Sequence, residues 1–249
     1  MKAIHLAALL TLIGAGALPT TRLAAAAQAP APSDEPADVD PFESKSKDEA
    51  PAPPLRDPHQ SLNRAFFAFN DKLYFWVLRP VAQGYKAVVP QTARVGVSNF
   101  FSNLGMPVRM TNCLLQGDMK GTGTELARFG VNTTVGILGF RDPAKSWLKL
   151  KKRDEDFGQT LAVWGMGPGS YVCIPIIGPS TYRDILGLPV NAVLNPATFL
   201  PGANAIHQVN STSLHLGEYE DLKKSALDPY ISVRDVYNQH RAHAILVRN

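Results

Sequence analysis

The segment from Leu62 to Leu78 constrains the fold most, because it has helical spacing and is apolar on more than one side. One arc of such a helix holds Leu62, Phe66, Phe69, Leu73, Trp76 and Val77, and Phe67, Phe75 and Leu78 lie outside it. A surface helix of a soluble protein needs only one apolar stripe, so this helix is either buried on most sides or in contact with lipid. Residue burial preferences favour the core, and Pro80 is expected to end the run.

Two further patterns predict helices, so the fold class is expected to be mostly α. One runs from Gly121 to Val135, and it has apolar Leu126, Phe129 and Val131 beside polar Glu125 and Arg128. The other begins near the C-terminus, where Asp228 is a candidate N-cap and Pro229 occupies the first helical position. Its expected face is formed by Tyr230, Val233, Tyr237 and His240.

Two short segments between these helices predict other structure. Gly136 and Gly139 interrupt the apolar run VGILGF, which allows a tight bend or a hinge there. The β-branched segment VCIPII is compatible with an extended strand, although Pro175 argues against a central one.

The N-terminal residues predict export. Lys2 precedes an apolar stretch from Ala3 to Leu18 and a run of small residues, which is typical of a secretory signal peptide over residues 1–27, cleaved after Ala27. Residues 28–56 are rich in proline and acidic side chains and predict a disordered tether. One domain is expected over residues 57–249, with a net charge of +6 against −4 for residues 30–56. An exported basic domain suits anionic lipid headgroups better than nucleic acid.

Beyond the signal peptide, no uninterrupted apolar run reaches the roughly 18 residues that a membrane-spanning helix needs. If the chain is in a membrane, we expect it to lie within one leaflet or to be held there by a partner.

The sequence lacks recognisable catalytic constellations. Ser98 and Ser180 lie in segments without the closing glycine of a nucleophile elbow. The histidines and cysteines lack metal-ligand spacing, and the glycine-rich GMGPG at residues 165–169 lacks the lysine of a phosphate loop. We therefore expect no enzyme activity, no metal and no cofactor.

Two features leave alternatives open. Cys113 and Cys173 are compatible with one disulfide or with two small buried side chains. The basic run over residues 149–153 and the acidic run over residues 154–156 form either solvated faces or a headgroup-binding rim.

A series of motifs extends from the end of the tether nearly to the end of the chain. The first part of the series consists of Asp57, Pro58, Asn63, Arg64, Phe69, Asn70, Arg79, Pro80, Val81, Ala82, Val89, Pro90, Arg94, Gly96, Val97, Ser98, Asn99, Phe100, Asn103, Leu104, Pro107, Leu115, Gln116, Gly117 and Asp118. The later motifs are RFGVNTTVGILGFRDPA, DFGQTLAVWGMGPGSYVCIPIIGPSTYRD and DPYISVRDVYNQH. In this order they resemble the MlaA/VacJ family.

This resemblance implies a single ring-like domain of amphipathic helices with a central amphipathic channel, in the inner leaflet of the outer membrane on its periplasmic side. It further implies removal of mislocalised phospholipids from the outer leaflet and their transfer to a periplasmic lipid-carrier protein, with a trimeric outer-membrane porin as scaffold. Members typically carry a lipobox cysteine, which this sequence lacks, so anchoring by the helices and a porin is the expectation.

Seven residues are candidates for the lipid path. Phe66, Phe69 and Asn70 are expected as structural or channel elements, and Arg183 and Asp184 as polar lining. Gly136 and Gly139 are the hinge or gate candidates. Aromatic packing, a helix-end ion pair and a tight turn are the respective structural alternatives. The alternative function is a periplasmic docking module that binds a protein partner without moving lipid.

Overall fold

The computed structural model of the chain describes residues 52–246, and most of this part is helical. The expected mostly-α class is therefore confirmed. The expected signal peptide and most of the expected tether lie outside the described residues.

The described elements follow one another as α2 (Gln60–Leu73), η1 (Tyr74–Leu78), α3 (Arg79–Val88), α4 (Gln91–Leu104), α5 (Met106–Leu115), α6 (Met119–Thr134), α7 (Pro143–Ser146), α8 (Phe157–Val163), β1 (Tyr171–Ile174), β2 (Gly178–Thr181), α9 (Tyr182–Leu194), η2 (Pro196–Phe199), α10 (Ala203–Leu214), α11 (Glu218–Ser225) and α12 (Pro229–Leu246).

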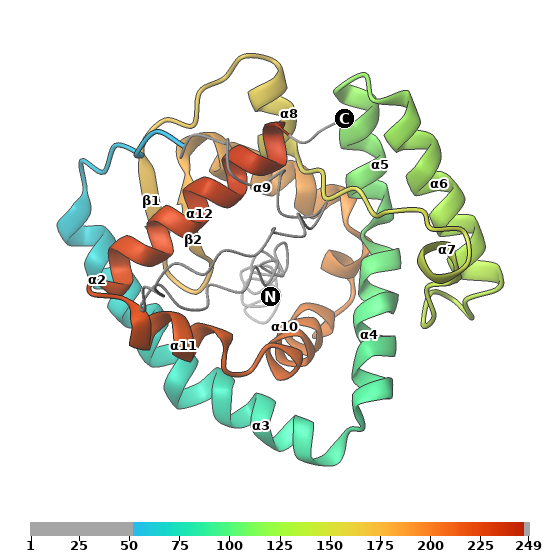
Figure 1. Ribbon diagram of the computed structural model, residues 1–249, viewed down its shortest axis with the longest axis horizontal. Helices are drawn as coiled ribbons and strands as arrows, with labels where there is room; N and C mark the ends of the chain where they lie inside the picture. The colour runs from blue at the N-terminus through green and yellow to red at the C-terminus, as the bar shows by residue number, and fades with distance from the viewer. Residues whose placement is uncertain (1–51, 247–249) are drawn as a thin grey trace, which may run out of the picture.

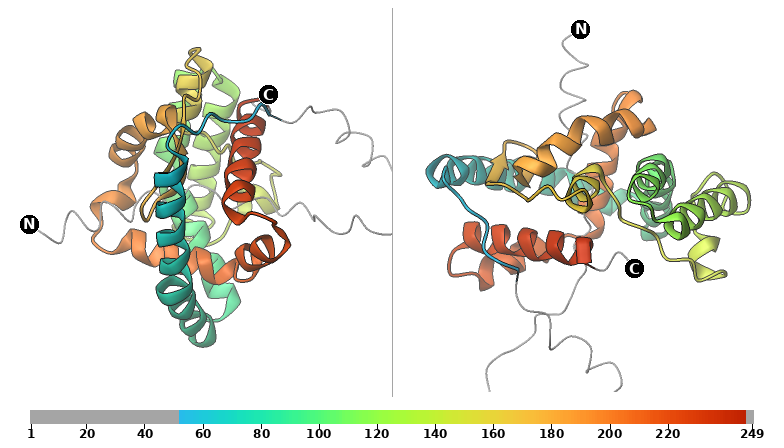
Figure 2. Two further views of the ribbon diagram at one scale, coloured as in Figure 1. Left: turned by 90° about the vertical axis from the view of Figure 1, so that its left-hand side faces the viewer. Right: turned by 90° about the horizontal axis from the view of Figure 1, so that it is seen from above.

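The elements are arranged as a ring around the centre of the view in Figure 1. Helix α2 and the strands lie at the left, α3 forms the lower edge, α4 and α5 form the right side, and α8 and α9 lie at the top. The two further views show α11 and α12 on one face of this ring and α9 on the other (Figure 2). The ring-like architecture implied by the family resemblance is thus present in the arrangement of the helices.

The helix that begins at Gln60 continues through Pro80, so the expectation that Pro80 ends it was wrong. Residues Tyr74–Leu78 form a π-helical turn, and the N–H of Arg79 bonds to the carbonyl of Tyr74, five residues back. The next residue, Pro80, has no N–H, so the return to α-helical bonding falls at a position that needs no partner. Helix α2, the π-helical turn η1 and helix α3 therefore form one continuous helix along the edge of the ring, which we call the long helical edge.

The corner between α3 and α4 is set by Pro90. A proline disfavours helical geometry in the residue before it, and Val89 is extended, with φ −99° and ψ 120°. Further starts are fixed by side-chain caps: Asp118 accepts from the Gly121 N–H at 2.7 Å, and Asp156 forms a capping box with Gln159. The predicted cap of α12 is confirmed, because Asp228 accepts from the Tyr230 N–H at 3.0 Å.

The strands form an antiparallel hairpin in which Tyr171 pairs with Thr181 and Ile174 with Gly178. The predicted extended segment VCIPII is a strand only as far as Ile174, so β1 ends immediately before Pro175. The small apolar core gathers here, between the hairpin, α2 and α12. Its buried members are Tyr171, Cys173 and Tyr230, against which Leu55, Phe66, Phe67, Ile231 and Tyr237 pack.

Many interior positions are polar, and many large apolar side chains face outward. Leu62, Phe69, Trp76 and Val77 of the first helical arc are exposed, with Trp76 at 75%. The expectation that this arc belongs to the core was wrong for these four residues. The core is small because the helices surround the centre instead of stacking their apolar faces together.

Helix α6 gives the clearest example of this inversion. Glu125 is fully buried, whereas its neighbour Leu126 is 57% exposed. Glu125 accepts from the Arg109 Nε at 2.7 Å and from the Arg153 N–H at 2.8 Å, and Arg128 pairs with Asp142 at 2.8 Å. A buried carboxylate is tolerable because it is paired and hydrogen-bonded.

Within residues 52–246, no helix combines the length and the apolar character required to cross a membrane.

Candidate functional site

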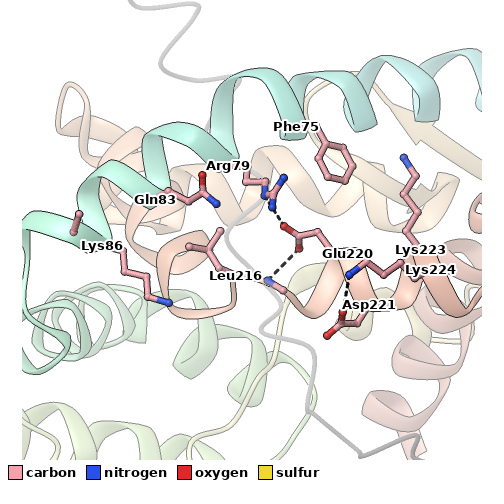
Figure 3. A pocket seen from close by; sticks show the side chains of 11 residues that line it. Phe75, Arg79, Gln83, Lys86, Leu216, Glu220, Asp221, Lys223 and Lys224 are labelled. Atoms are coloured by element: carbon pink, nitrogen blue, oxygen red, sulfur yellow. Dashed lines mark hydrogen bonds and ion pairs between the residues drawn. The ribbon is translucent and has the colours of Figure 1, made fainter.

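A hollow of about 1080 Å³ opens between the long helical edge and α11. Figure 3 shows that one wall comes from η1 and α3 and the other from α11 and the residues just before it. The lining residues are Phe75, Arg79, Gln83, Lys86, Ala87, Leu216, Gly217, Glu220, Asp221, Lys223 and Lys224.

The α3 wall presents a stripe of hydrogen-bond donors. Arg79, Gln83 and Lys86 are spaced by four and three residues, which places them on one face of the helix. The Nε of Arg79 lies 3.0 Å from a carboxylate oxygen of Glu220. Among the described residues Lys86 has neither an ion pair nor a side-chain hydrogen bond. Its charge is therefore available to a ligand.

The opposite wall, α11, is held mainly by polar contacts, since none of its residues is buried. The Tyr74 hydroxyl donates to Glu220 at 3.0 Å, and the Tyr219 hydroxyl donates to Asp71 at 2.8 Å. Lys223 binds both carboxylate oxygens of Asp71 at 2.8 Å. We call these contacts of Tyr74, Asp71, Tyr219, Glu220 and Lys223 the α11 latch.

Aromatic rings pack against one another and against the cations of the α11 latch. The ring centroids of Tyr74 and Tyr219 are 4.9 Å apart in an edge-on arrangement. Lys223 Nζ lies 4.7 Å from the centroid of the Phe75 ring, and the guanidinium carbon of Arg79 lies 5.7 Å from it. Both are cation–π contacts, which stabilise the two cations beside the ring. Burial, followed by the hydrogen bond to Glu220, raises the pKa of Tyr74, so its phenol remains a donor at neutral pH.

The residues predicted on α2 lie outside the lining of this hollow. Phe66 packs against the apolar core, and Phe69 is half-exposed. Asn70 donates to the Ile174 carbonyl at 2.9 Å and accepts from the Ile176 N–H at 2.6 Å, so it ties α2 to the β-hairpin.

Arg183 and Asp184 lie in a buried ionic cluster between α8, α9 and α12. Asp184 is 3.1 Å from Arg183 and 2.8 Å from Arg241, and it also accepts from the Tyr237 hydroxyl. Burial by itself would raise the pKa of Asp184, but Arg241, Tyr237 and Arg183 outweigh it and hold the pKa below its usual range. The carboxylate is therefore ionised at neutral pH and connects α9 to α12, and Arg241 extends the cluster to Asp156 at the start of α8.

Gly136 and Gly139 lie in the tight turn after α6, as the sequence allowed. A Cβ at Gly136 would lie 2.4 Å from the Asn132 carbonyl oxygen, and Gly139 has φ +89° with the Asn103 side chain against it. Only glycine fits both positions. The hinge or gate role stays a prediction.

The two cysteines are separate buried thiols, on α5 and on β1. Burial raises the pKa of Cys113 to about 12 and that of Cys173 to about 11. The sequence was compatible with a disulfide or with two small buried side chains. The structure has two small buried side chains.

The apolar outer surface is the second feature of the site. It is especially dense around the turns that follow α6 and α7, where the exposed side chains are Val135, Ile137, Leu138, Phe140, Trp147 and Leu148. Elsewhere it includes Trp76, Val88, Trp164 and Phe199. Exposed apolar area on this scale marks a surface that contacts lipid or protein.

Neither the donor stripe on α3 nor the basic end of α11 is among the residues predicted from the sequence. A signal existed for both, because the domain carries excess positive charge and Lys223 and Lys224 are adjacent. Arg79 was noted only as part of a family pattern. The pairing of the two walls could not be read from the sequence, since they are separated by more than 120 residues.

Comparison with known proteins identifies relatives over most of the chain. The family model described as MlaA lipoprotein matches residues 55–244. The Intermembrane phospholipid transport system lipoprotein MlaA of Escherichia coli (strain K12) is 35% identical over 190 residues, which cover 74% of this chain and 76% of that protein. An uncharacterized protein of Rickettsia bellii is 34% identical over 196 residues, which cover 76% of each.

A solved structure gives the same result in three dimensions. It concerns the structural basis for maintenance of bacterial outer membrane lipid asymmetry, and its chain matches with a TM-score of 0.68 and 35% identity. The match covers 76% of this chain and 98% of the other.

Proposed function

The chain belongs to the MlaA lipoprotein family, and on that premise we propose that it acts in intermembrane phospholipid transport. In this role it removes mislocalised phospholipids from the outer leaflet of the outer membrane and passes them to a periplasmic carrier. Among the relatives, the Escherichia coli protein is named for such a transport system.

The observation that carries the proposal is the inverted distribution of polarity. Charged residues such as Glu125 and Arg128 are buried, whereas Leu126, Trp76 and Trp147 face outward. Apolar side chains on the outside are stabilised when acyl chains replace water around them. The arrangement supports a body embedded in the inner leaflet on the periplasmic side, with a polar interior for headgroups.

The transport step that we propose needs no bond chemistry. Polar and basic groups receive the headgroup while the acyl chains stay in lipid. Moving an unpaired charge through hydrocarbon would cost roughly several kcal/mol, and this route avoids that cost. The amphipathic channel implied by the family resemblance is the proposed route. Phe69, Arg183 and Asp184 stay candidates for roles along it, beside the structural contacts described above.

The partners are those that the family resemblance implies, and the exposed apolar surface supports them. We propose that a trimeric outer-membrane porin covers part of the exposed apolar area and acts as the scaffold, and that a soluble lipid carrier receives the phospholipid on the periplasmic side. An apolar band that is partly covered by protein and partly by lipid would hold the ring in one leaflet.

The test is the amount of phospholipid exposed on the cell surface, measured by surface labelling in the source bacterium with the gene intact, deleted and restored. We expect deletion to raise the exposure and the intact chain to reverse it. Unchanged exposure after deletion would refute the proposal and favour a docking module that moves no lipid.

A further inference from the structure

We propose that the hollow beside α3 binds the phosphodiester of a phospholipid headgroup, with Arg79, Gln83 and Lys86 as its donors. The inference rests on the proposed function and specifies where, and by what charge, a headgroup is held. The ligand group is the phosphate diester of the lipid, which carries one negative charge.

The three donors converge on one opening. They occupy one face of α3, and Figure 3 shows their side chains extending from the helix toward Leu216 and α11. A guanidinium, an amide and an ammonium in a row offer several N–H groups to the oxygens of a phosphate. Gln83 contributes a neutral donor, which keeps the charge of the stripe low enough for a monoanion.

Among the described residues that line the hollow, Lys86 is the cation without an ion pair. Arg79 is balanced by Glu220, and Lys223 is balanced by Asp71. Lys224 lies 3.7 Å from Asp221, and both side chains are largely exposed. One unbalanced positive charge matches the single negative charge of a phosphate diester.

Two acids, Glu220 and Asp221, lie in this wall, and both face cations. One oxygen of Glu220 contacts Arg79, and the other accepts from the Tyr74 hydroxyl at 3.0 Å and from the Gly217 N–H at 3.1 Å. Both of its oxygens are therefore already engaged by donors of the protein.

Apolar groups share the lining and select a lipid over a free phosphate. Phe75, Ala87 and Leu216 border the same opening as the donors. Such a lining suits the glycerol and the first methylene groups of a lipid, which inorganic phosphate lacks. The charged stripe and the apolar patch together match the boundary between headgroup and acyl chains.

Binding should be measured on the purified full-length chain in amphipol, titrated with dihexanoyl phosphatidylglycerol, with glycerol 3-phosphate and with inorganic phosphate. The variants are Lys86→Gln, Lys86→Arg and Gln83→Leu, and the control is Lys120→Gln on the exposed surface of α6. Lys86→Gln should weaken binding of the short-chain lipid about fivefold, Gln83→Leu should weaken it too, and Lys86→Arg and the control should retain it.

Each contrary result has a distinct meaning. Equal affinity of the wild-type chain for inorganic phosphate and for the lipid would overturn the headgroup assignment. Unchanged lipid affinity in both Lys86→Gln and Gln83→Leu would overturn the hollow as the site while leaving the proposed function standing. If the wild-type chain does not bind the lipid, both the headgroup site and the proposed transport function are overturned. Because Lys86 is exposed and without a described partner, its substitution should not unfold the protein.

Discussion

The hydroxyl of Tyr74 donates a 3.0 Å hydrogen bond to Glu220, which connects the π-helical turn of the long helical edge to α11. These two residues are 146 positions apart in the sequence. Since α11 has no buried residue, this bond and its neighbours in the α11 latch determine whether the helix stays against the hollow.

Replacing Tyr74 by Phe should loosen α11 without unfolding the ring. A net hydrogen bond contributes about 1 kcal/mol, so the free energy of unfolding should fall by no more than about that amount. Amide hydrogen exchange over residues 217–225 should become faster. The matched control is Tyr85→Phe, which removes the hydroxyl that bonds Asn210 at 3.1 Å, outside the latch. Equal exchange over residues 217–225 in both variants would contradict the assignment.

Replacing Asp184 by Asn should destabilise the fold strongly. The substitution removes the charge that Arg183 and Arg241 face in the interior, and breaking a buried pair in this way costs about 3 kcal/mol. Denaturant unfolding in detergent measures the effect. Asp235→Asn, at the more exposed partner of Arg234, should lower stability by less than about 1 kcal/mol. If both variants lose a similar free energy of unfolding, the buried ionic cluster around Asp184 does not stabilise the fold more than an exposed ion pair does.

Stability should fall as the pH drops below about 6.5, in part because of His207. Burial, and then the charge of Lys152, lower its pKa in the folded chain, and its ring lies 4.7 Å from that of Phe101. The unfolded chain therefore binds a proton at a higher pH than the folded chain does, so acidification favours unfolding. His240, whose pKa burial also lowers, contributes in the same direction.

The variant His207→Phe removes this titration and keeps a ring in place. Denaturation midpoints at pH 7.5 and pH 5.5 should differ less in His207→Phe than in the wild-type chain. An identical pH difference in both proteins would show that His207 does not contribute.

Cys113 and Cys173 should be unreactive thiols in the folded protein. With pKa values raised by burial to about 12 and about 11, the thiolate fraction at pH 8 falls about a hundredfold or more below that of a free cysteine. Maleimide labelling should be slow in the native state and should reach both residues in denaturant. A non-reduced mass two hydrogens below the reduced mass would reveal a disulfide and contradict the structure.

Placing a lysine on the apolar surface should reduce lipid binding more than it reduces stability. Leu126 is exposed, so Leu126→Lys should leave the fold intact while costing about 2 kcal/mol in hydrocarbon, or roughly thirtyfold in partitioning. Liposome flotation of the purified chain measures the change. Asp154→Lys introduces the same side chain at an exposed polar position and should not lower flotation. Equal flotation of Leu126→Lys and wild type would indicate that α6 does not contact lipid.

Sequence patterns predicted individual elements better than they predicted their surroundings. Asp228 and Pro229 specified the start of α12, and the spacing of the apolar residues specified α6, because caps and periodicity act within a few residues. The prediction that Pro80 ends the helix was wrong because a proline breaks a helix only where its missing N–H would be needed. The π-helical turn before Pro80 removes that need. A π-helical turn carries no sequence signal comparable to a cap.

The site was only partly predictable for a related reason. Arg183 and Asp184 were recognised as polar residues of interest, but their partner Arg241 lies 57 residues beyond Asp184. The hollow combines α3 with α11, and no local pattern relates these helices. Pairing between distant segments is decided by packing and by burial.

By itself the sequence determined the helical character of the domain, its family and the start of α12, because these depend on local spacing, on a cap and on matched motifs. Only the tertiary structure decided which side of each helix faces outward. The period of 3.6 residues is the same whether Leu126 or Glu125 points inward. Glu125 is inside because Arg109 and the Arg153 N–H satisfy its carboxylate there, and those partners are brought to it by the fold.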